Sequence, residues 1–404
     1  MTGYLLEHAL VDGVVLDDVG IEVEDGVITS VDGSGGVPVP GLTLPALANC
    51  HSHAFHRALR ARTQTGRGTF WTWREQMYAV AAELTPDSYF DLAVDVYAEM
   101  VASGIGAVGE FHYLHHQPDG TPYDDPNAMG RALLAAADEA GIRIRLLDTC
   151  YLASGIGTET VGVQRRFSDG DAVRWAERVA AFDDERVAMA IHSVRAVPRI
   201  QLRAVAEAAA GRPLHVHLSE QVAENEACLA AYGMTPTQVL AEAGALGPLT
   251  TVVHATHLTA TDISLLGDAR AFACFCPTTE RDLADGIGPS RALHDAGARL
   301  TLGSDSHAVI DLFEEMRGVE MHERLATRER GHWSAAELLT AATATGHESL
   351  GFTDGGRLAV GQRADLRVLD LASWRLRGTG ASAESVAFAA TGADVRPFGP
   401  GGAR

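Results

Sequence analysis

Two histidines, His51 and His53, lie two positions apart in the segment 49–53, which reads NCHSH. In an extended segment both side chains project to the same face, so the pair could share one metal ion. His217 and Asp305, each at the end of an apolar run, add a third imidazole and a carboxylate. This set suits Zn²⁺ with a bound water. The alternative is four hydrogen-bonded core residues, because a lone His-x-His also occurs by chance.

A metal-activated water needs side chains that move protons. Glu220 comes three residues after His217, where it could reach such a water; otherwise it is an exposed acid at a helix N-terminus. His254 ends another apolar run, and His257 follows three residues later. We favour His254 as the catalytic base or polarising group because of its place at the strand end, and His257 stays an open alternative. Asp305 could also take a proton from the water.

These residues must be positioned by the elements that carry them, and the chain between its two ends alternates apolar strands with amphipathic helices. Helical patterns such as 88–102, 128–140, 172–181 and 200–209 separate eight strand candidates. The candidates are 42–49, 105–111, 142–149, 187–191, 213–218, 250–253, 271–276 and 299–303. This α/β pattern predicts a (β/α)₈ TIM-like barrel over residues 46–354, with a doubly wound sheet as the alternative. The candidate residues would then meet at the C-terminal mouth of the barrel.

Both ends of the chain differ from this middle part, because they consist of short strands broken by turns. Residues 14–16, 21–23 and 27–28 are strand-like, and Glu24-Asp25-Gly26 forms a turn between the last two. The region after about residue 355 repeats this character, with a strand candidate at 365–369. We therefore predict a small β-sandwich built from both termini, residues 1–45 and 355–404.

The composition excludes several reaction classes. The 404 residues contain 32 Lys plus Arg and 53 Asp plus Glu, a net charge of −21, and all 32 basic residues are Arg. Coding bias explains the missing lysine most simply, and its absence excludes Schiff-base, pyridoxal-phosphate, P-loop and carbamylated-lysine chemistry. A chain with this negative charge is a poor candidate for binding nucleic acids or anionic membranes.

The sequence also bears on where the protein works. The first basic residue is Arg57, and no apolar run approaches the roughly 18 residues that span a bilayer. Five cysteines without a Cys-x-x-Cys pair favour free thiols. We therefore expect a cytoplasmic protein with no nucleic-acid or membrane partner; a homodimer stays open.

The pattern of ligands resembles the amidohydrolase superfamily, whose members share a His-x-His pair, two further histidines and an aspartate after the last strand. The likeness covers almost the whole chain, including the β-sandwich. The segment 217–220, HLSE, is similar to the deaminase branch, which implies a single divalent metal. Zn²⁺ is the default, with Fe²⁺ and Mn²⁺ as alternatives. The absent lysine agrees with that branch, because two-metal members commonly use a carbamylated lysine.

Three further segments resemble the formimidoylglutamate deiminases of histidine degradation: FWTWRE at 70–75, EFHYLHHQPDG at 110–120 and HSVR at 192–195. This resemblance implies hydrolysis of N-formimidoyl-L-glutamate, a small dicarboxylate amidine, to N-formyl-L-glutamate and ammonia. It places the metal on His51, His53, His217 and Asp305. It implies catalysis by Glu220, His254 and Asp305, and substrate contacts from His56, Arg74, Tyr113, His192 and Arg195. The family often has Gln where His56 stands.

Two other functions stay open. A single-metal deaminase of an aminopurine, a pterin or an adenosine derivative would share every metal ligand. It would have no use for Arg74 and Arg195, which offer planar forks for two carboxylates. Either arginine alone could instead form an ordinary surface ion pair. The second alternative is a non-catalytic scaffold, which should have lost ligands that this sequence retains.

Overall fold

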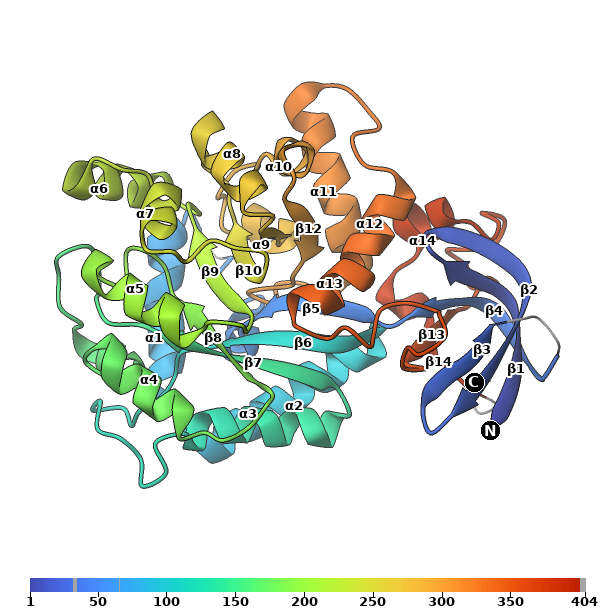
Figure 1. Cartoon of the computed structure of the whole chain (residues 1–404), viewed down its shortest axis with the longest axis horizontal. Helices are drawn as coiled ribbons and strands as arrows, with labels where there is room; N and C mark the ends of the chain where they lie inside the picture. Colours follow the sequence, from blue (N-terminus) through green and yellow to red (C-terminus); the bar gives the residue numbers. More distant parts are fainter. Residues whose placement is uncertain (32–34, 65, 400–404) are drawn as a thin grey trace.

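A computed structural model describes residues 1–31, 35–64 and 66–399 of the chain. Its largest element is a sheet of eight parallel strands that neighbour one another in chain order, from β5 to β12 (Figure 1). The strands are β5 (Leu47–Ser52), β6 (Ile105–His112), β7 (Arg143–Cys150), β8 (Val187–Ile191), β9 (Leu214–Leu218), β10 (Thr250–His254), β11 (Phe272–Phe275) and β12 (Arg299–Leu302). All eight C-terminal ends therefore lie at one mouth, which confirms the predicted (β/α)₈ barrel.

The barrel closes through a short seam between its last and first strands. Ser52 of β5 forms a parallel bridge with Asp305, beyond the end of β12. The amide of Asp305 donates to the carbonyl of His51 at 2.9 Å, and the amide of His53 donates to the carbonyl of Asp305 at 3.2 Å. Gly303 permits this approach, since a Cβ there would lie 2.8 Å from the Cβ of His51. The seam thus joins the backbone of Asp305 directly to that of the histidine pair.

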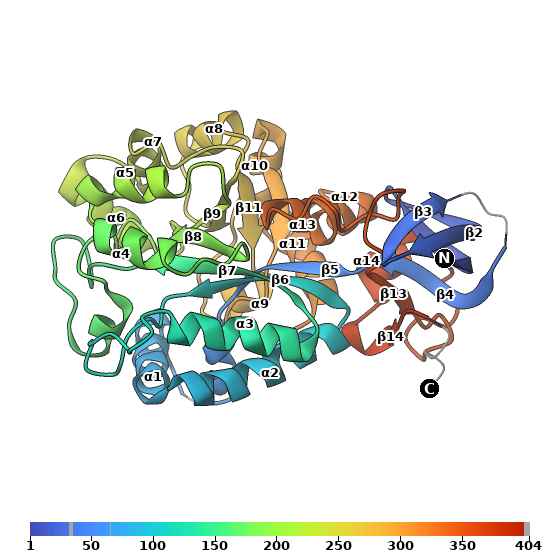
Figure 2. The same ribbon diagram turned by 60° about the horizontal axis from the view of Figure 1, so that its bottom comes forward.

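Helices pack on the outside of the barrel (Figures 1 and 2). Local sequence sets their ends: the Thr85 side chain accepts from the amide of Ser88 at the start of α2, and Gly141 ends α3 with φ +71°. The helices are α1 (Phe70–Glu83), α2 (Pro86–Ala102), α3 (Ala128–Ala140), α4 (Ala172–Ala180), α5 (Arg199–Ala208), α6 (Val222–Tyr232), α7 (Pro236–Glu242), α8 (Ala260–Asp268), α9 (Pro277–Asp282), α10 (Ser290–Ala296), α11 (Leu312–Thr327), α12 (Ala335–Ala342), α13 (Ala344–Ser349) and α14 (Ala383–Ala389).

Strands near the two ends of the chain form a separate sheet beside the barrel (Figure 1). Its six strands, in the order β14-β13-β4-β1-β2-β3, are β1 (Thr2–Val11), β2 (Val14–Glu24), β3 (Val27–Val31), β4 (Val37–Pro45), β13 (Leu366–Leu369) and β14 (Val395–Pro397). They enclose their own small core, which includes Leu6, Ile21 and Leu366. The predicted β-sandwich built from both termini is confirmed as a separate β unit, which consists of one six-stranded sheet; the bounds 1–45, 46–354 and 355–404 stay a prediction.

The predicted first barrel strand, 42–49, is wrong in its bounds. Residues 42–45 belong to β4 of the terminal sheet, and the barrel strand β5 begins only at Leu47. The apolar run continues through both strands, so hydrophobicity does not mark where the chain passes from one sheet to the other. In the part of the chain that the structure describes, no helix has the length and apolar character needed to cross a membrane.

Candidate active site

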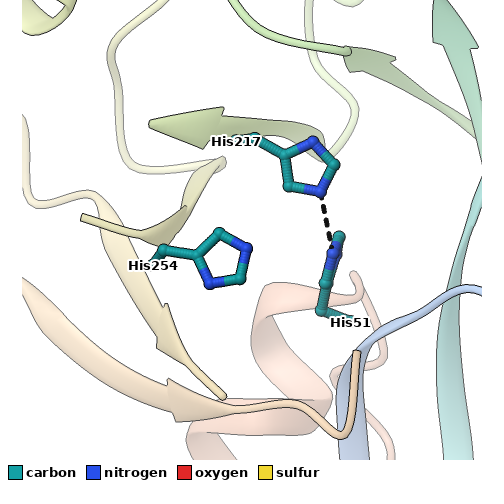
Figure 3. A group of neighbouring side chains, drawn as sticks. All are labelled: His51, His217 and His254. Atoms are coloured by element: carbon teal, nitrogen blue, oxygen red, sulfur yellow. Dashed lines mark hydrogen bonds between the residues drawn. The ribbon is translucent and has the colours of Figure 1, made fainter. Parts of the chain in front are cut away.

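Three histidines and an aspartate converge at the mouth of the barrel. The Nε2 atoms of His51 and His53 each lie 3.4 Å from Oδ1 of Asp305. Nε2 of His217 lies 3.0 Å from Nε2 of His51 and 3.4 Å from Nε2 of His53. The rings of His51 and His217 point toward each other in Figure 3. A tetrahedral Zn²⁺ with bonds of about 2.0–2.1 Å would separate its ligand atoms by roughly 3.4 Å, so the spacing suits such an ion.

Two backbone carbonyls fix the tautomers of His53 and His217. Nδ1 of His53 donates to the carbonyl of Phe111, and Nδ1 of His217 donates to the carbonyl of His192, both at 2.9 Å. Burial lowers the pKa of both imidazoles well below its usual value, so they are neutral. Each Nε2 therefore presents a lone pair to the other across 3.4 Å. Facing lone pairs repel unless a cation lies between them, and the donor set thus fits a divalent metal.

Asp305 supplies the negative charge of the set. Burial would raise the pKa of this carboxyl, but the hydrogen bond and charge of His51, followed by the charge of His254, hold it below its usual value. Asp305 is therefore ionised at neutral pH. Its second oxygen, Oδ2, lies 3.6 Å from Nε2 of His254, which places the carboxylate between the ligand histidines and the predicted catalytic histidine.

His254 and Glu220 form a second layer beside the ligands. Nε2 of His254 lies 3.9 Å from Oε1 of Glu220, and Nδ1 lies 3.6 Å from Oε1 of Glu280. Burial would lower the pKa of His254, but the charge of Glu220 and the carboxylates of Glu280 and Asp305 raise it well above the usual value. Burial raises the pKa of Glu220. The two groups are thus suited to exchanging a proton. Figure 3 shows His254 beside His217 and His51.

The structure places His254 rather than His257 at the cavity. His254 lines the cavity wall. His257 is only half-buried, is not among the residues that line the wall, and its carbonyl accepts from the Asn225 side chain at 2.6 Å.

Several strand ends at the mouth adopt a strained backbone. Ser219, His254, Ala255, Asp305 and His307 have φ between +44° and +68°, although none is glycine. Residues other than glycine rarely adopt this left-handed region, because their Cβ atoms clash with the backbone. Such strain persists where the surrounding structure holds the backbone in place. The backbone therefore turns sharply where the predicted catalytic and ligand residues leave their strands.

One cavity connects this centre to the predicted substrate residues. Every predicted site residue except His51 contributes to its wall, and His51 is fully buried against the other ligands. The lining residues are His53, His56, Phe70, Trp73, Arg74, Met77, Tyr78, Tyr113, Tyr151, Phe167, His192, Arg195, His217, Glu220, His254, Leu283 and Asp305. The structure therefore brings all eleven predicted residues together.

Arg74 and Arg195 bring positive charge into this cavity without a carboxylate in ion-pair contact; the charges of Glu224 and Glu220 act on Arg195 from a longer distance. Among the described residues, no carboxylate oxygen lies within 4.0 Å of either guanidinium, in contrast to Arg57, Arg178 and Arg199, which each form an ion pair. Nε of Arg74 and Nη1 of Arg195 are buried and have no hydrogen-bond partner there. The Arg74 guanidinium packs over the rings of Trp71 and Tyr78. Surface ion pairing therefore does not explain these arginines, and the geometry fits anionic groups of a ligand.

The remaining predicted substrate residues supply uncharged polar groups. Nε2 of His56 lies 3.1 Å from the hydroxyl of Tyr113. Burial lowers the pKa of His56 to about 3 and that of His192 well below its usual value, so both rings are neutral. They can orient a ligand by hydrogen bonds without adding charge.

Sequence reasoning missed part of the wall. Tyr151 directly follows β7, and its ring lies 4.6 Å from that of His192. Nε2 of Gln164 donates to the hydroxyls of both Tyr78 and Tyr151 at 2.9 Å. Tyr151 had a usable signal, because it occupies a strand end like the other candidates. Gln164 lies in a short 3₁₀ turn with no pattern of its own.

Comparison with known proteins gives a consistent result. The profile of the amidohydrolase family matches residues 42–396. The chain is 36% identical over 394 residues to formimidoylglutamate deiminase of Pseudomonas aeruginosa strain PAO1, covering 92% of this chain and 86% of that protein. It is 31% identical to 5-methylthioadenosine/S-adenosylhomocysteine deaminase of Natronomonas pharaonis, covering 89% of this chain and 80% of that protein.

Solved structures show the same architecture. An amidohydrolase from Brucella melitensis superposes with a TM-score of 0.88 at 30% identity, covering 98% of this chain and 94% of the other. An adenosine deaminase from Xanthomonas campestris with bound zinc has a TM-score of 0.83 at 24% identity, covering 98% and 90%.

Proposed function

This chain belongs to the amidohydrolase family, and from that premise we propose that it hydrolyses N-formimidoyl-L-glutamate to N-formyl-L-glutamate and ammonia in histidine degradation. The family and its deaminase relatives support a metal-dependent hydrolase acting on carbon–nitrogen bonds. The observation that carries the finer proposal is the pair Arg74 and Arg195, which line the cavity without carboxylate partners.

The substrate's two carboxylates match this pair. A guanidinium presents a planar fork of N–H groups to a carboxylate, and the bond is charge-assisted at both partners. With its carboxylates on Arg74 and Arg195, the substrate would direct its formimidoyl group toward the histidine ligands that line the same cavity. His56, Tyr113 and His192 would orient it by hydrogen bonds.

A single divalent metal, Zn²⁺ in this proposal, would be held by His51, His53, His217 and Asp305. When bound, the metal acts as a Lewis acid and lowers the pKa of a water toward neutrality.

The chain's own residues move the protons. Asp305 accepts the proton of the water as the water oxygen attacks the formimidoyl carbon. His254, whose pKa the neighbouring carboxylates raise well above its usual value, polarises the formimidoyl group as a hydrogen-bond donor. Glu220 then delivers a proton to the nitrogen that leaves as ammonia, because an amide anion is a very poor leaving group.

One rival function has a specific observation in its favour. Trp73, Tyr151 and Phe167 give the cavity aromatic walls that could stack a flat ring, and one relative is a deaminase of adenosine derivatives. A neutral purine leaves the buried Nε of Arg74 and Nη1 of Arg195 without an acceptor, however, which is costly. The arginine pair therefore favours the dicarboxylate.

The test combines metal analysis of the purified protein with ammonia release from formimidoyl-glutamate, formimidoyl-aspartate, S-adenosylhomocysteine and a panel of aminopurines. We expect bound metal and fastest release from formimidoyl-glutamate. Release from a purine but not from the amidines would establish the rival function. A protein without metal that releases no ammonia from any compound would be a scaffold.

A further inference from the structure

Five buried polar side chains form an unbroken hydrogen-bonded chain along the seam that closes the barrel. Its members come from β5, β6 and the segment after β12, and each is 0% exposed: Asn49, Ser304, His307, Ser52 and Glu110. None of the five lines the substrate cavity, as far as the described residues define it. The hydrogen-bonded chain therefore acts through the residues beside it.

The distances along the chain are those of good hydrogen bonds. Nδ2 of Asn49 donates to Oγ of Ser304 at 2.6 Å. Nδ1 of His307 lies 3.0 Å from Oγ of Ser304, and Nε2 of His307 lies 3.0 Å from Oγ of Ser52. The Ser52 hydroxyl donates to Oε2 of Glu110 at 2.5 Å.

One tautomer of His307 satisfies the whole chain. With its proton on Nε2, His307 accepts from the Ser304 hydroxyl and donates to Ser52, which donates to the Glu110 carboxylate. Each group then donates to the next in a single direction, an arrangement in which hydrogen bonds polarise and strengthen one another. His307 is the member that joins the two halves, because Ser304 and Ser52 lie on opposite sides of the seam.

Members of the hydrogen-bonded chain alternate in sequence with the metal ligands. Ser52 lies between His51 and His53 in sequence, and Ser304 directly precedes Asp305. Glu110 also fixes the backbone directly after His53, because its Oε1 accepts from the amide of Ala54 at 2.7 Å. Ser52, Ala54 and Ser304, which each adjoin a ligand in sequence, are thus held by members of the hydrogen-bonded chain.

The seam between β5 and the segment after β12 has few backbone links of its own. Among the described residues, Ser52 and Asp305 form the one β-bridge between the two edges, where the other strands share ladders. Asp305 and His307 have φ of +44° and +57°, so the segment after β12 is strained. The side-chain links therefore add to the two backbone hydrogen bonds that hold Asp305 at its distance from the two histidines.

We propose that His307 is a positioning residue, which holds Asp305 in register with His51 and His53 and so sets the affinity of the metal site. The inference rests on the proposed function only for the presence of a divalent metal at these ligands, not for the substrate. Groups that orient metal ligands are commonly worth about 10- to 100-fold in metal affinity.

The experiment measures the zinc dissociation constant by chelator competition for the full-length protein and for His307→Phe. The matched control is His347→Phe: His347 is 2% exposed, and its Nε2 lies 3.1 Å from the carbonyl of Ala46, at the other end of the first barrel strand. We expect His307→Phe to raise the dissociation constant about 10- to 100-fold. His347→Phe should lower thermal stability but leave the dissociation constant within about twofold of wild type.

Two further variants keep the test decisive if His307→Phe does not fold. Ser304→Ala removes one link and should weaken zinc binding. His307→Asn suits the left-handed backbone and keeps a polar group near Ser304, so it should recover part of the affinity. In His307→Phe, adding Ser304→Ala should cost nothing more, because the two residues act in one chain.

Zinc affinity unchanged in His307→Phe or Ser304→Ala, or losses equal to those of His347→Phe, would overturn the inference, as would a wild-type protein that binds no divalent metal. A wild-type protein that binds zinc through this chain but releases no ammonia from formimidoyl-glutamate would contradict the proposed substrate alone.

Discussion

Two buried clusters of histidine and aspartate lie at the ends of barrel strands: the set around Asp305, and a set around Asp148 with His112 and His115. By residue type and spacing, both could hold a metal. In the second, however, Nη1 and Nη2 of Arg178 donate to the two oxygens of Asp148, each at 2.8 Å. The positive charge that a metal would bring is already supplied by the protein.

The cavity shows the opposite arrangement. Asp305 faces imidazoles and no arginine within ion-pair distance, and Arg74 and Arg195 have no carboxylate there, in the part of the chain that the structure describes. The protein therefore neutralises Asp148 with an arginine, whereas at the cavity Asp305 faces only imidazoles and the two arginines have no carboxylate in ion-pair contact. Unpaired buried charge is expensive, so it indicates where ligands bind.

Removal of a metal ligand should have the largest effect. Asp305→Ala should abolish stoichiometric metal and lower kcat about 10³-fold or more, since a metal supplies several kcal/mol of transition-state stabilisation. Elemental analysis and ammonia release measure both effects. His115→Ala, in the other cluster, should keep its metal; equal metal loss in the two variants would mean that both clusters serve the same ion.

Removing the internal cation tests the second cluster. Arg178→Leu leaves Asp148 buried without its partner, so the free energy of unfolding should fall by about 3–5 kcal/mol in urea titrations. Metal affinity should not change. The control is Arg186→Leu, whose partners Asp184 and Asp138 share a more exposed site, and it should cost at most about 1 kcal/mol. A small effect at Arg178 would show that Asp148 is balanced by something else.

Much of the fold could be predicted, because strand and helix periods are local properties. The helix α3 was predicted with its observed bounds, Ala128–Ala140. The first barrel strand was misplaced because the chain passes between two sheets inside one apolar run. Hydrophobicity reports burial, and both strands are buried.

The site divides in the same way. His51, His53, His217 and Asp305 were predicted because each is a ligand type at a strand end, where barrel geometry forces convergence. The role of Arg178 could not be predicted, because it depends on contact with a residue 30 positions away. The absence of partners around Arg195 is likewise visible only in three dimensions.

A smaller effect tests the unpaired arginines. Arg195→Met should raise KM for formimidoyl-glutamate roughly 10- to 100-fold, because a hydrogen bond to a charged group contributes about 1.5–3 kcal/mol. The free energy of unfolding should change little, since among the described residues no carboxylate oxygen lies within 4.0 Å of Arg195 and the charges of Glu224 and Glu220 act on it only from a longer distance. Arg199→Met, which breaks an ion pair with Glu242 beside the same loop, is the control and should leave KM unchanged. An unchanged kcat/KM in Arg195→Met would show that Arg195 does not bind a carboxylate of the substrate.

Two buried glutamates, Glu224 and Glu320, should change the pH dependence of folding stability by a smaller amount. Glu224 has an oxygen with no hydrogen-bond partner among the described residues, and burial raises its pKa to about 7. Glu320 accepts from Arg324 and from the amides of Gly331 and Trp333. Burial alone would raise the pKa of Glu320, but these hydrogen bonds lower it.

Replacing each glutamate with glutamine should therefore change the free energy of unfolding at pH 8 in opposite directions. A raised folded-state pKa favours folding below the unfolded value of about 4.3, and this contribution is lost as pH rises toward 7. Glu224→Gln, which mimics the neutral acid, should stabilise the protein at pH 8 relative to its effect at pH 5. Glu320→Gln should destabilise it at pH 8, because an ionised carboxylate is what its partners bind. Urea unfolding at both pH values measures the difference, and equal signs at pH 8 would show that internal pairing does not separate these two sites.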